Sequence, residues 1–170
     1  MNRRILSFIL VALIALLVIT GSAFASTSME VSGTMAYAGP FTNLEMQSAG
    51  DNCIIELDLP YAFSGDMQGS VPFHFRVVSH GACPAAPFQY AENLKAQGTF
   101  TGSVGDKEGS LELKFVAKAW PAEPGDLALT GKIIILSGTG ELAHLHGLLD
   151  VSYIMGNDFD SYAGQLHFDP

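Results

Sequence analysis

Apolar and polar residues alternate with a period of two along most of the chain beyond residue 28, and no segment there sustains the stripe of a long helix. Because successive side chains of a strand point to opposite faces, this alternation predicts β-strands. The eight predicted strands cover residues 29–37, 53–63, 71–77, 100–104, 111–115, 127–135, 148–154 and 162–168. Residues 38–52 are interpreted as a connection.

The predicted strands follow one another through mostly short turns, which favours a closed barrel over a sandwich. We therefore predict an all-β fold: an eight-stranded antiparallel up-and-down barrel made by a single domain of residues 26–170. In the first hairpin, the apolar faces predict that Tyr61 pairs with Phe73. In the next hairpin, Val104 is predicted to pair with Leu111, leaving residues 106–109 as the loop.

The first 25 residues are predicted to be a signal peptide. Arg3 and Arg4 form a basic start, residues 5–20 an apolar stretch, and residues 23–25 (Ala-Phe-Ala) a cleavage site. An uncleaved anchor is the alternative, since about 20 apolar residues can span a bilayer. We therefore predict a secreted or otherwise extracytoplasmic protein, with no membrane association once the leader is removed.

The charge balance argues against nucleic acids and anionic membrane surfaces as partners. Beyond residue 25 the chain carries six basic and 17 acidic residues, a net charge near −11. Nucleic acids and anionic membrane surfaces both need a basic footprint. Neither is therefore predicted as a partner.

Cys53 and Cys83 are the two cysteines of the chain. In an exported protein, two cysteines most simply form one disulfide. A shift of the first hairpin by one residue pair would place them opposite each other. Closing this loop should contribute about 3–4 kcal/mol in the chain-entropy model, and two free buried thiols are the alternative.

The segment Leu136–Leu142 (Leu-Ser-Gly-Thr-Gly-Glu-Leu) follows an apolar strand, where a phosphate-binding loop could stand. It lacks the lysine of a P-loop and the third glycine of a dinucleotide site, and Glu141 places negative charge where an anion would lie. We predict instead one short helical turn, capped by Thr139 and ended by Gly147.

His144 and His146 form the one pair with metal-ligand spacing. On a strand their imidazoles would share a face and could bind a metal, whereas on a helical turn they point in different directions. They are interpreted as surface histidines and as weak metal candidates. No metal or other cofactor is predicted.

Paired carboxylates offer the one arrangement for acid–base chemistry. Glu56 and Asp58 share a strand face. Arg76 on the next strand favours a surface ion-pair cluster instead. We therefore assign no catalytic residue, and the sequence favours a role other than catalysis.

The shared apolar face would line the lumen of the barrel. An eight-stranded barrel is just wide enough either to fill with side chains or to hold one small ligand. So many large side chains favour a packed core, and a pocket for a small apolar ligand is the alternative. The candidate lumen residues for such a ligand are Tyr61, Phe63, Phe73, Phe75, Phe100 and Phe115.

Residues 137–142 and 145–147, after an apolar strand, resemble the Gly-Thr-Gly signature of the allene oxide cyclase and dirigent barrels. The whole pattern is more similar still to a family of small exported bacterial proteins of unknown function in that superfamily. This similarity lies in residues 63–66, 98–102, 136–142 and 164–170. The resemblance covers most of residues 28–170 and implies an eight-stranded barrel, often trimeric in the plant relatives. It supplies no active-site residue, and the two cysteines depart from the plant enzymes.

We conclude from the sequence that this is an exported β-barrel protein of unknown specific activity, with a binding or structural role. One alternative is a small apolar-ligand binder that uses the barrel lumen. Another is a cyclase- or dirigent-like enzyme, which rests on resemblance alone. A homo-oligomer, a trimer by resemblance, is the expected partner arrangement.

Overall fold

The computed structural model describes residues 28–84, 89–121, 127–153 and 159–169, so the predicted signal peptide (1–25) lies outside the described residues. These ranges contain nine strands and no helix. They therefore hold no helix that could cross a membrane. The strands are β1 (Ser28–Tyr37), β2 (Thr42–Ala49), β3 (Asn52–Gly65), β4 (Met67–Ser79), β5 (Glu92–Val104), β6 (Lys107–Pro121), β7 (Leu127–Gly140), β8 (Leu145–Tyr153) and β9 (Asp160–Phe168).

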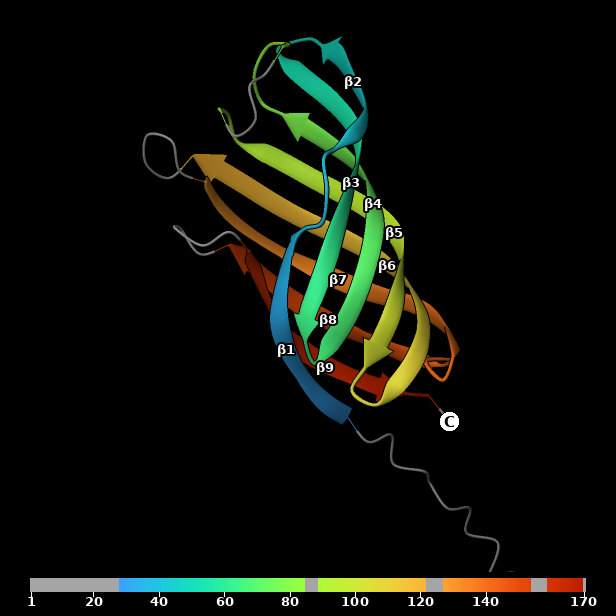
Figure 1. The fold of residues 1–170 in the computed structure, drawn as a ribbon. Coiled ribbons are helices and arrows are strands. Elements are labelled where there is room, and N and C mark those ends of the chain that lie inside the picture. Colours follow the sequence, from blue (N-terminus) through green and yellow to red (C-terminus); the bar gives the residue numbers. More distant parts are fainter. Residues whose placement is uncertain (1–27, 85–88, 122–126, 154–158, 170) are drawn as a thin grey trace, which may run out of the picture.

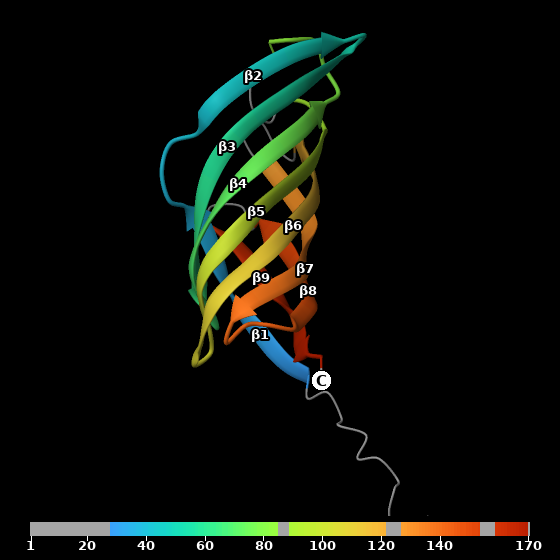
Figure 2. The same ribbon diagram turned by 90° about the vertical axis from the view of Figure 1, so that its right-hand side faces the viewer.

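All nine strands belong to one antiparallel sheet, and its hydrogen bonds form a ring (Figure 1). The strand order is β1-β9-β8-β7-β6-β5-β4-β3-β2, and a further pairing between β1 and β3 joins the two sides. Eight strands make up the ring, while β2 pairs with β3 outside it. Figure 2 shows β2 and the first half of β3 extending well beyond β1. The prediction of an all-β antiparallel fold is confirmed.

Strand β2 corrects the interpretation of residues 38–52 as a connection. Every residue of β2 is exposed, so it lacks the alternation in burial that marks the other strands. It forms because β3 extends beyond the end of β1, where its edge would otherwise have no partner. The chain therefore has nine strands in place of the predicted eight.

The predicted short helical turn is also wrong. The chain between β7 and β8 forms a turn, with hydrogen bonds from Leu142 N to Thr139 O (3.2 Å) and from Leu145 N to Leu142 O (3.1 Å). Gly140 and His144 both have left-handed backbones, with φ of 65° and 64°. A right-handed helix accepts neither conformation, so only residues 141–143 lie between the two, and the chain reverses into β8.

A disulfide joins Cys53 and Cys83 with a Cα–Cα distance of 5.0 Å, as predicted. The register of the first hairpin differs from the prediction, because Phe73 pairs with Leu59, two residues from the expected partner. Cys53 stands opposite Ser79, and the disulfide reaches Cys83 in the segment after β4. The bond therefore ties that segment to the start of β3.

The second hairpin is tighter than predicted. Val104 pairs with Lys107, four residues before its expected partner, and only Gly105 and Asp106 remain in the loop. Gly105 has a φ of 60°, which provides the left-handed conformation that such a short loop needs. Both register shifts are even, so each side chain keeps its predicted face.

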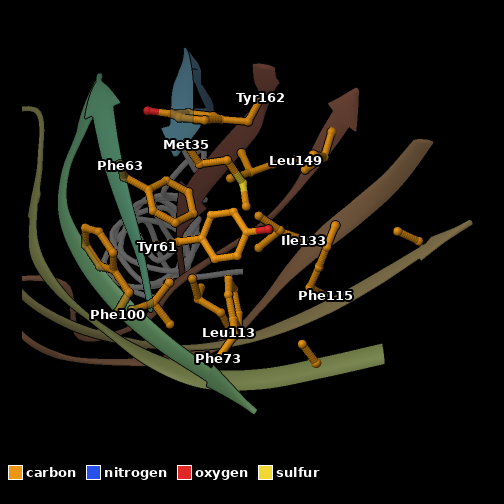
Figure 3. Close-up of a cluster of buried hydrophobic side chains, with 14 of the residues drawn as sticks. Met35, Tyr61, Phe63, Phe73, Phe100, Leu113, Phe115, Ile133, Leu149 and Tyr162 are labelled. Carbon is orange, nitrogen blue, oxygen red and sulfur yellow. The ribbon is translucent and has the colours of Figure 1, made fainter. Parts of the chain in front are cut away.

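The inward side chains of the ring form one hydrophobic core (Figure 3). Its largest fully buried side chains are Tyr162, Phe73, Phe100, Phe115, Met35, Met67, Leu111, Leu113, Ile133, Leu142, Leu145 and Leu149. Arg76, Lys95, Lys114, Lys118 and Lys132 lie on the outer face, as the alternation of their strands requires.

One end of the ring, where the β3–β4, β5–β6 and β7–β8 turns lie, is closed by its own side chains; we call it the turn end. The Tyr162 hydroxyl accepts a hydrogen bond from Met67 N (2.9 Å) and donates one to Ser64 O (3.1 Å). Neighbouring turns are joined as well, because Gly105 N donates to Asp66 O (2.9 Å). These hydrogen bonds therefore link the turns that close this end.

Candidate functional site

Three polar or charged side chains are buried among the described residues: Ser79, Glu92 and Asp160. Each stands at a strand end, as the last residue of β4, the first of β5 and the first of β9. These strand ends lie along the upper left side of the ring in Figure 1, opposite the turn end. We call the edge defined by these three residues the acidic rim.

Asp160 is the most unusual residue of the acidic rim. It is only 8% exposed and is the register partner of Met35 on β1 and of Tyr153 on β8. No residue within the described ranges forms a hydrogen bond or ion pair with its carboxyl group. Burial raises the pKa of this carboxyl to about 6. Buried acids with raised pKa values cluster at functional sites, which makes Asp160 a candidate site residue.

Two tyrosines lie beside Asp160, on the strands that close the ring. Tyr37 and Tyr61 are register partners, their ring centroids are 5.0 Å apart, and their hydroxyls share a hydrogen bond. Burial raises the pKa of Tyr61 well above its usual range, and the neighbouring Tyr37 and Asp160 add to that effect. Tyr61 is buried, whereas Tyr37 is 59% exposed. The pair therefore connects the core to the solvent next to the acid.

The opposite side of the acidic rim carries Ser79 and Glu92, which are register partners on β4 and β5. The Ser79 hydroxyl is fully buried and forms no hydrogen bond with the described residues. A buried hydroxyl without a partner costs free energy of folding, on the order of 1–3 kcal/mol. The rim thus holds two buried polar groups, Ser79 and Asp160, whose hydrogen bonding the described residues leave unsatisfied.

The wall above Asp160 is apolar and incompletely covered. Leu57 and Leu59 point to the inner face of β3, pack against the core and are only half-buried. They lie in the part of β3 that extends beyond β1, where β4 pairs on one side and β2 takes the place of β1 on the other. Tyr153 is likewise half-buried against the core. An apolar group approaching from this side would therefore contact exposed parts of the inner face.

The six predicted lumen residues all lie inside the ring and contact one another. Each is at most 5% exposed. Ring centroids are 5.6 Å apart for Phe63 and Phe100, and 6.1 Å for Phe73 and Phe115. Figure 3 shows five of the six, Tyr61, Phe63, Phe73, Phe100 and Phe115, among the side chains of the core. Of the six, Tyr61 is the one that also reaches the acidic rim, through Tyr37.

The structure separates the two histidines of the predicted metal pair. His144 is exposed in the turn, whereas His146 lies on β8 beside His167 of β9. Asp169 lies near both of these imidazoles, 3.5 Å from His146 Nε2 and 3.4 Å from His167 Nε2. Within the described ranges, no group of three or more potential ligands is arranged to hold a metal ion.

The carboxylates on the outside of β3 form ion pairs, as predicted. Glu56 binds Arg76 with an N–O distance of 3.1 Å, and Asp58 binds His74 at 2.7 Å. A hydrogen bond from Asn43 and the contact with His74 together lower the pKa of Asp58. Asp58 is thereby stabilised as a carboxylate on the surface, which does not suit it to acid–base catalysis.

Sequence reasoning missed Ser79, Glu92 and Asp160. A usable signal exists for Asp160, because it lies two residues before the inward-facing Tyr162 and so shares its face. An acid in that position interrupts an apolar face at the start of a strand. The same alternation places Glu92 on the face of Leu94.

Comparison with known proteins identifies the fold and no activity. No family model and no curated protein matches the sequence. The structure is similar to the crystal structure of a protein of unknown function, of the DUF3224 family, from Shewanella oneidensis MR-1. The TM-score is 0.58 and the identity 17%, over 85% of this chain and 99% of that chain. At this identity the likeness shows that the two proteins share a fold.

Proposed function

We propose that this chain is an exported β-barrel protein that binds a small ligand at the acidic rim. The observation that carries the proposal is the carboxyl group of Asp160, buried to 8% exposure without a hydrogen-bond partner among the described residues. A fold gains nothing from such a group, because burying an unpaired carboxylate is costly. Its presence is best explained by a partner that arrives from outside.

The two ends of the ring support entry from the rim. Tyr162 and Met67 are fully buried and seal the turn end. At the rim, by contrast, inward-facing Leu57 and Leu59 are half-buried and Tyr37 is exposed. A ligand with an apolar body would bury these surfaces and place a polar group near Asp160. This position differs from the deep lumen, which the aromatic side chains occupy.

Export and architecture belong to the same proposal. The predicted leader and the Cys53–Cys83 disulfide both suit an oxidising compartment outside the cytoplasm. The eight-stranded ring, closed by the pairing of β1 with β3, suits a barrel of the allene oxide cyclase and dirigent type. The resemblance to small exported bacterial proteins in that superfamily agrees with both.

A homo-oligomer, with a trimer implied by the resemblance, completes the proposal. Ile134 and Leu148 are register partners on the outer face of β7 and β8, and Leu148 is 41% exposed. Leu136, the extra residue of a bulge in β7, is 48% exposed beside them. Apolar side chains grouped on an outer face are typical of a surface covered by another subunit.

Native mass spectrometry of the protein purified from its own host tests the ligand. We expect a bound small molecule that is present in the wild-type protein and lost or depleted in Asp160→Asn. Asp106→Asn, in the exposed β5–β6 loop, is the matched control and should retain the molecule. Ligand binding at the rim would be overturned if the wild-type protein carried no small molecule. It would also be overturned if Asp160→Asn retained the molecule as well as the wild type does.

An enzyme is a second candidate, and the pKa of Asp160 favours it. A carboxyl group with a pKa of about 6 can accept or donate a proton near neutral pH, and the Tyr61 phenol lies close by. The same mass spectra separate the two candidates. A binding protein releases its molecule unchanged, whereas an enzyme converts it on prolonged incubation.

A further inference from the structure

We propose that the ligand of the acidic rim is an organic cation, a protonated amine whose ammonium group pairs with Asp160 while its apolar part contacts Tyr37, Tyr61 and Leu59. This inference rests on the proposed binding function and specifies its ligand class. Three observations carry it: the absence of a resident cation near the acid, the aromatic surroundings, and the charge of the whole chain.

The protein supplies no cation of its own to Asp160. The six basic residues beyond residue 25 all lie within the described ranges and none is buried. They are Arg76, Lys95, Lys107, Lys114, Lys118 and Lys132. Arg76 and Lys132 form ion pairs with acids on the outside of the ring. An arriving ammonium group would therefore be the first positive charge at this carboxylate.

Met35 faces Asp160 from β1, and the polar groups around the acid are phenols: Tyr37 from β1, Tyr61 from β3 and Tyr153 from β8. Aromatic faces attract cations, and attract them more strongly when water is excluded. A buried carboxylate surrounded by tyrosines therefore offers an ammonium group both an ion pair and cation–π contacts. An anion would be repelled by the Asp160 carboxylate, and no basic side chain lies there to compensate it.

The apolar wall defines the rest of the ligand. Leu57 and Leu59 extend the inner face of β3 above the tyrosines, and both are half-buried. A hydrated inorganic cation would gain nothing from this wall. Within the described ranges the rim also provides no group of three ligands for a metal ion. An amine attached to an aromatic or aliphatic body fits both surfaces.

The long-range field favours the same class. With a net charge near −11 beyond residue 25, the chain raises the local concentration of cations and repels anions. The field alone is not selective, because it acts on every cation. Selectivity comes from the single buried acid, which makes Asp160→Asn the decisive variant.

Titration calorimetry and two-dimensional NMR with two matched probes test the inference. Phenethylamine carries an ammonium group, and 2-phenylethanol is its neutral counterpart. At pH 7.5 we expect phenethylamine to bind at least about tenfold more tightly, with amide shifts around Asp160. This preference should disappear in Asp160→Asn and below pH 5, where Asp160 is protonated, and should persist in Asp106→Asn.

The outcomes separate this inference from the proposed function. If both probes shift the rim resonances and bind equally well, the ligand is not a cation, but binding at the rim stands. If Asp160→Asn keeps the preference for phenethylamine, Asp160 does not recognise the ammonium group and the inference falls. If neither probe shifts the rim and the native protein carries no small molecule, both the inference and the proposed function are wrong.

Discussion

Asp160 holds a charge that the described residues leave uncompensated, and this makes stability depend on pH. Burial raises its pKa from 3.8 to about 6, so the folded protein holds this proton more tightly than the unfolded chain does. The carboxyl group therefore does not reduce stability below the unfolded pKa, and its cost grows as the pH rises from about 4 to 6. Above that range, the cost is on the order of 2–3 kcal/mol.

We predict that Asp160→Asn stabilises the protein by on the order of 2 kcal/mol at pH 7.5, and by less than half as much at pH 4.5. Urea unfolding of both proteins at the two pH values measures the difference. Asp106→Asn removes an exposed acid and should show no such pH dependence. A variant that is less stable than the wild type at pH 7.5 would show that the charge has a partner after all.

Tyr162 differs from Asp160, because its buried hydroxyl both accepts and donates a hydrogen bond. Removing the hydroxyl in Tyr162→Phe leaves the buried Met67 N–H without an acceptor. We predict a loss of about 1–3 kcal/mol in the free energy of unfolding, measured by urea denaturation. Tyr90→Phe is the control, because the Tyr90 hydroxyl has no hydrogen bond with the described residues. Equal effects of the two changes would contradict the role of the Tyr162 hydroxyl.

At the residue scale, the sequence predicts which face a side chain takes and not what it meets there. Alternation alone places Tyr61, Phe63 and Phe73 inside, and the structure agrees. Tyr37 of β1 and Tyr61 of β3 are distant from Asp160 in sequence and approach it only when the ring closes, whereas Tyr153 stands on the preceding strand. The sequence therefore predicts which positions point inward. It does not predict which of them meet to form the site.

At the scale of elements, the strands whose residues alternate in burial could be predicted from the sequence. Strand β2 has no such alternation and could not be predicted. Strand β2 is exposed on every residue and is set by its pairing to β3. The predicted registers of the two hairpins were wrong for a related reason. An even shift leaves all faces unchanged, so the apolar pattern cannot distinguish one register from the next. The loop decides instead, as Gly105 does in the β5–β6 hairpin.

The disulfide is the strongest constraint on the extended end of β3. We predict that Cys53→Ala/Cys83→Ala lowers the free energy of unfolding by about 3–4 kcal/mol, because the bond restricts the unfolded chain. Urea unfolding measures this loss. Wild-type protein in reductant separates the bond from the small cavity that Cys53→Ala creates, and should lose nearly as much. An unchanged midpoint in both samples would show that the bond contributes nothing.

At the scale of the whole molecule, the ring has two different ends and one unusual side. Tyr162 and neighbouring turns seal the turn end, while the acidic rim contains the buried polar groups. Ile134, Leu136 and Leu148 lie together on the outside of β7 and β8. Strand β7 is thus apolar on both faces, which is typical of a strand covered on both sides. The core covers its inner face, and we propose that a second copy of the chain covers the outer face.

This assignment predicts the oligomeric state and its response to a single charge. We expect the protein without its leader to form an oligomer, a trimer by resemblance, in size-exclusion chromatography with light scattering. Leu148→Lys should convert it to a monomer, because a buried lysine would lack a partner across the contact. Its thermal midpoint, measured on the monomer, should change little, since the position is exposed within one chain. Ser70→Lys, on the outer face of β4, is the control and should leave the oligomer intact. A monomeric wild type, or an oligomer that Leu148→Lys leaves unchanged, would remove β7 and β8 from any contact between copies.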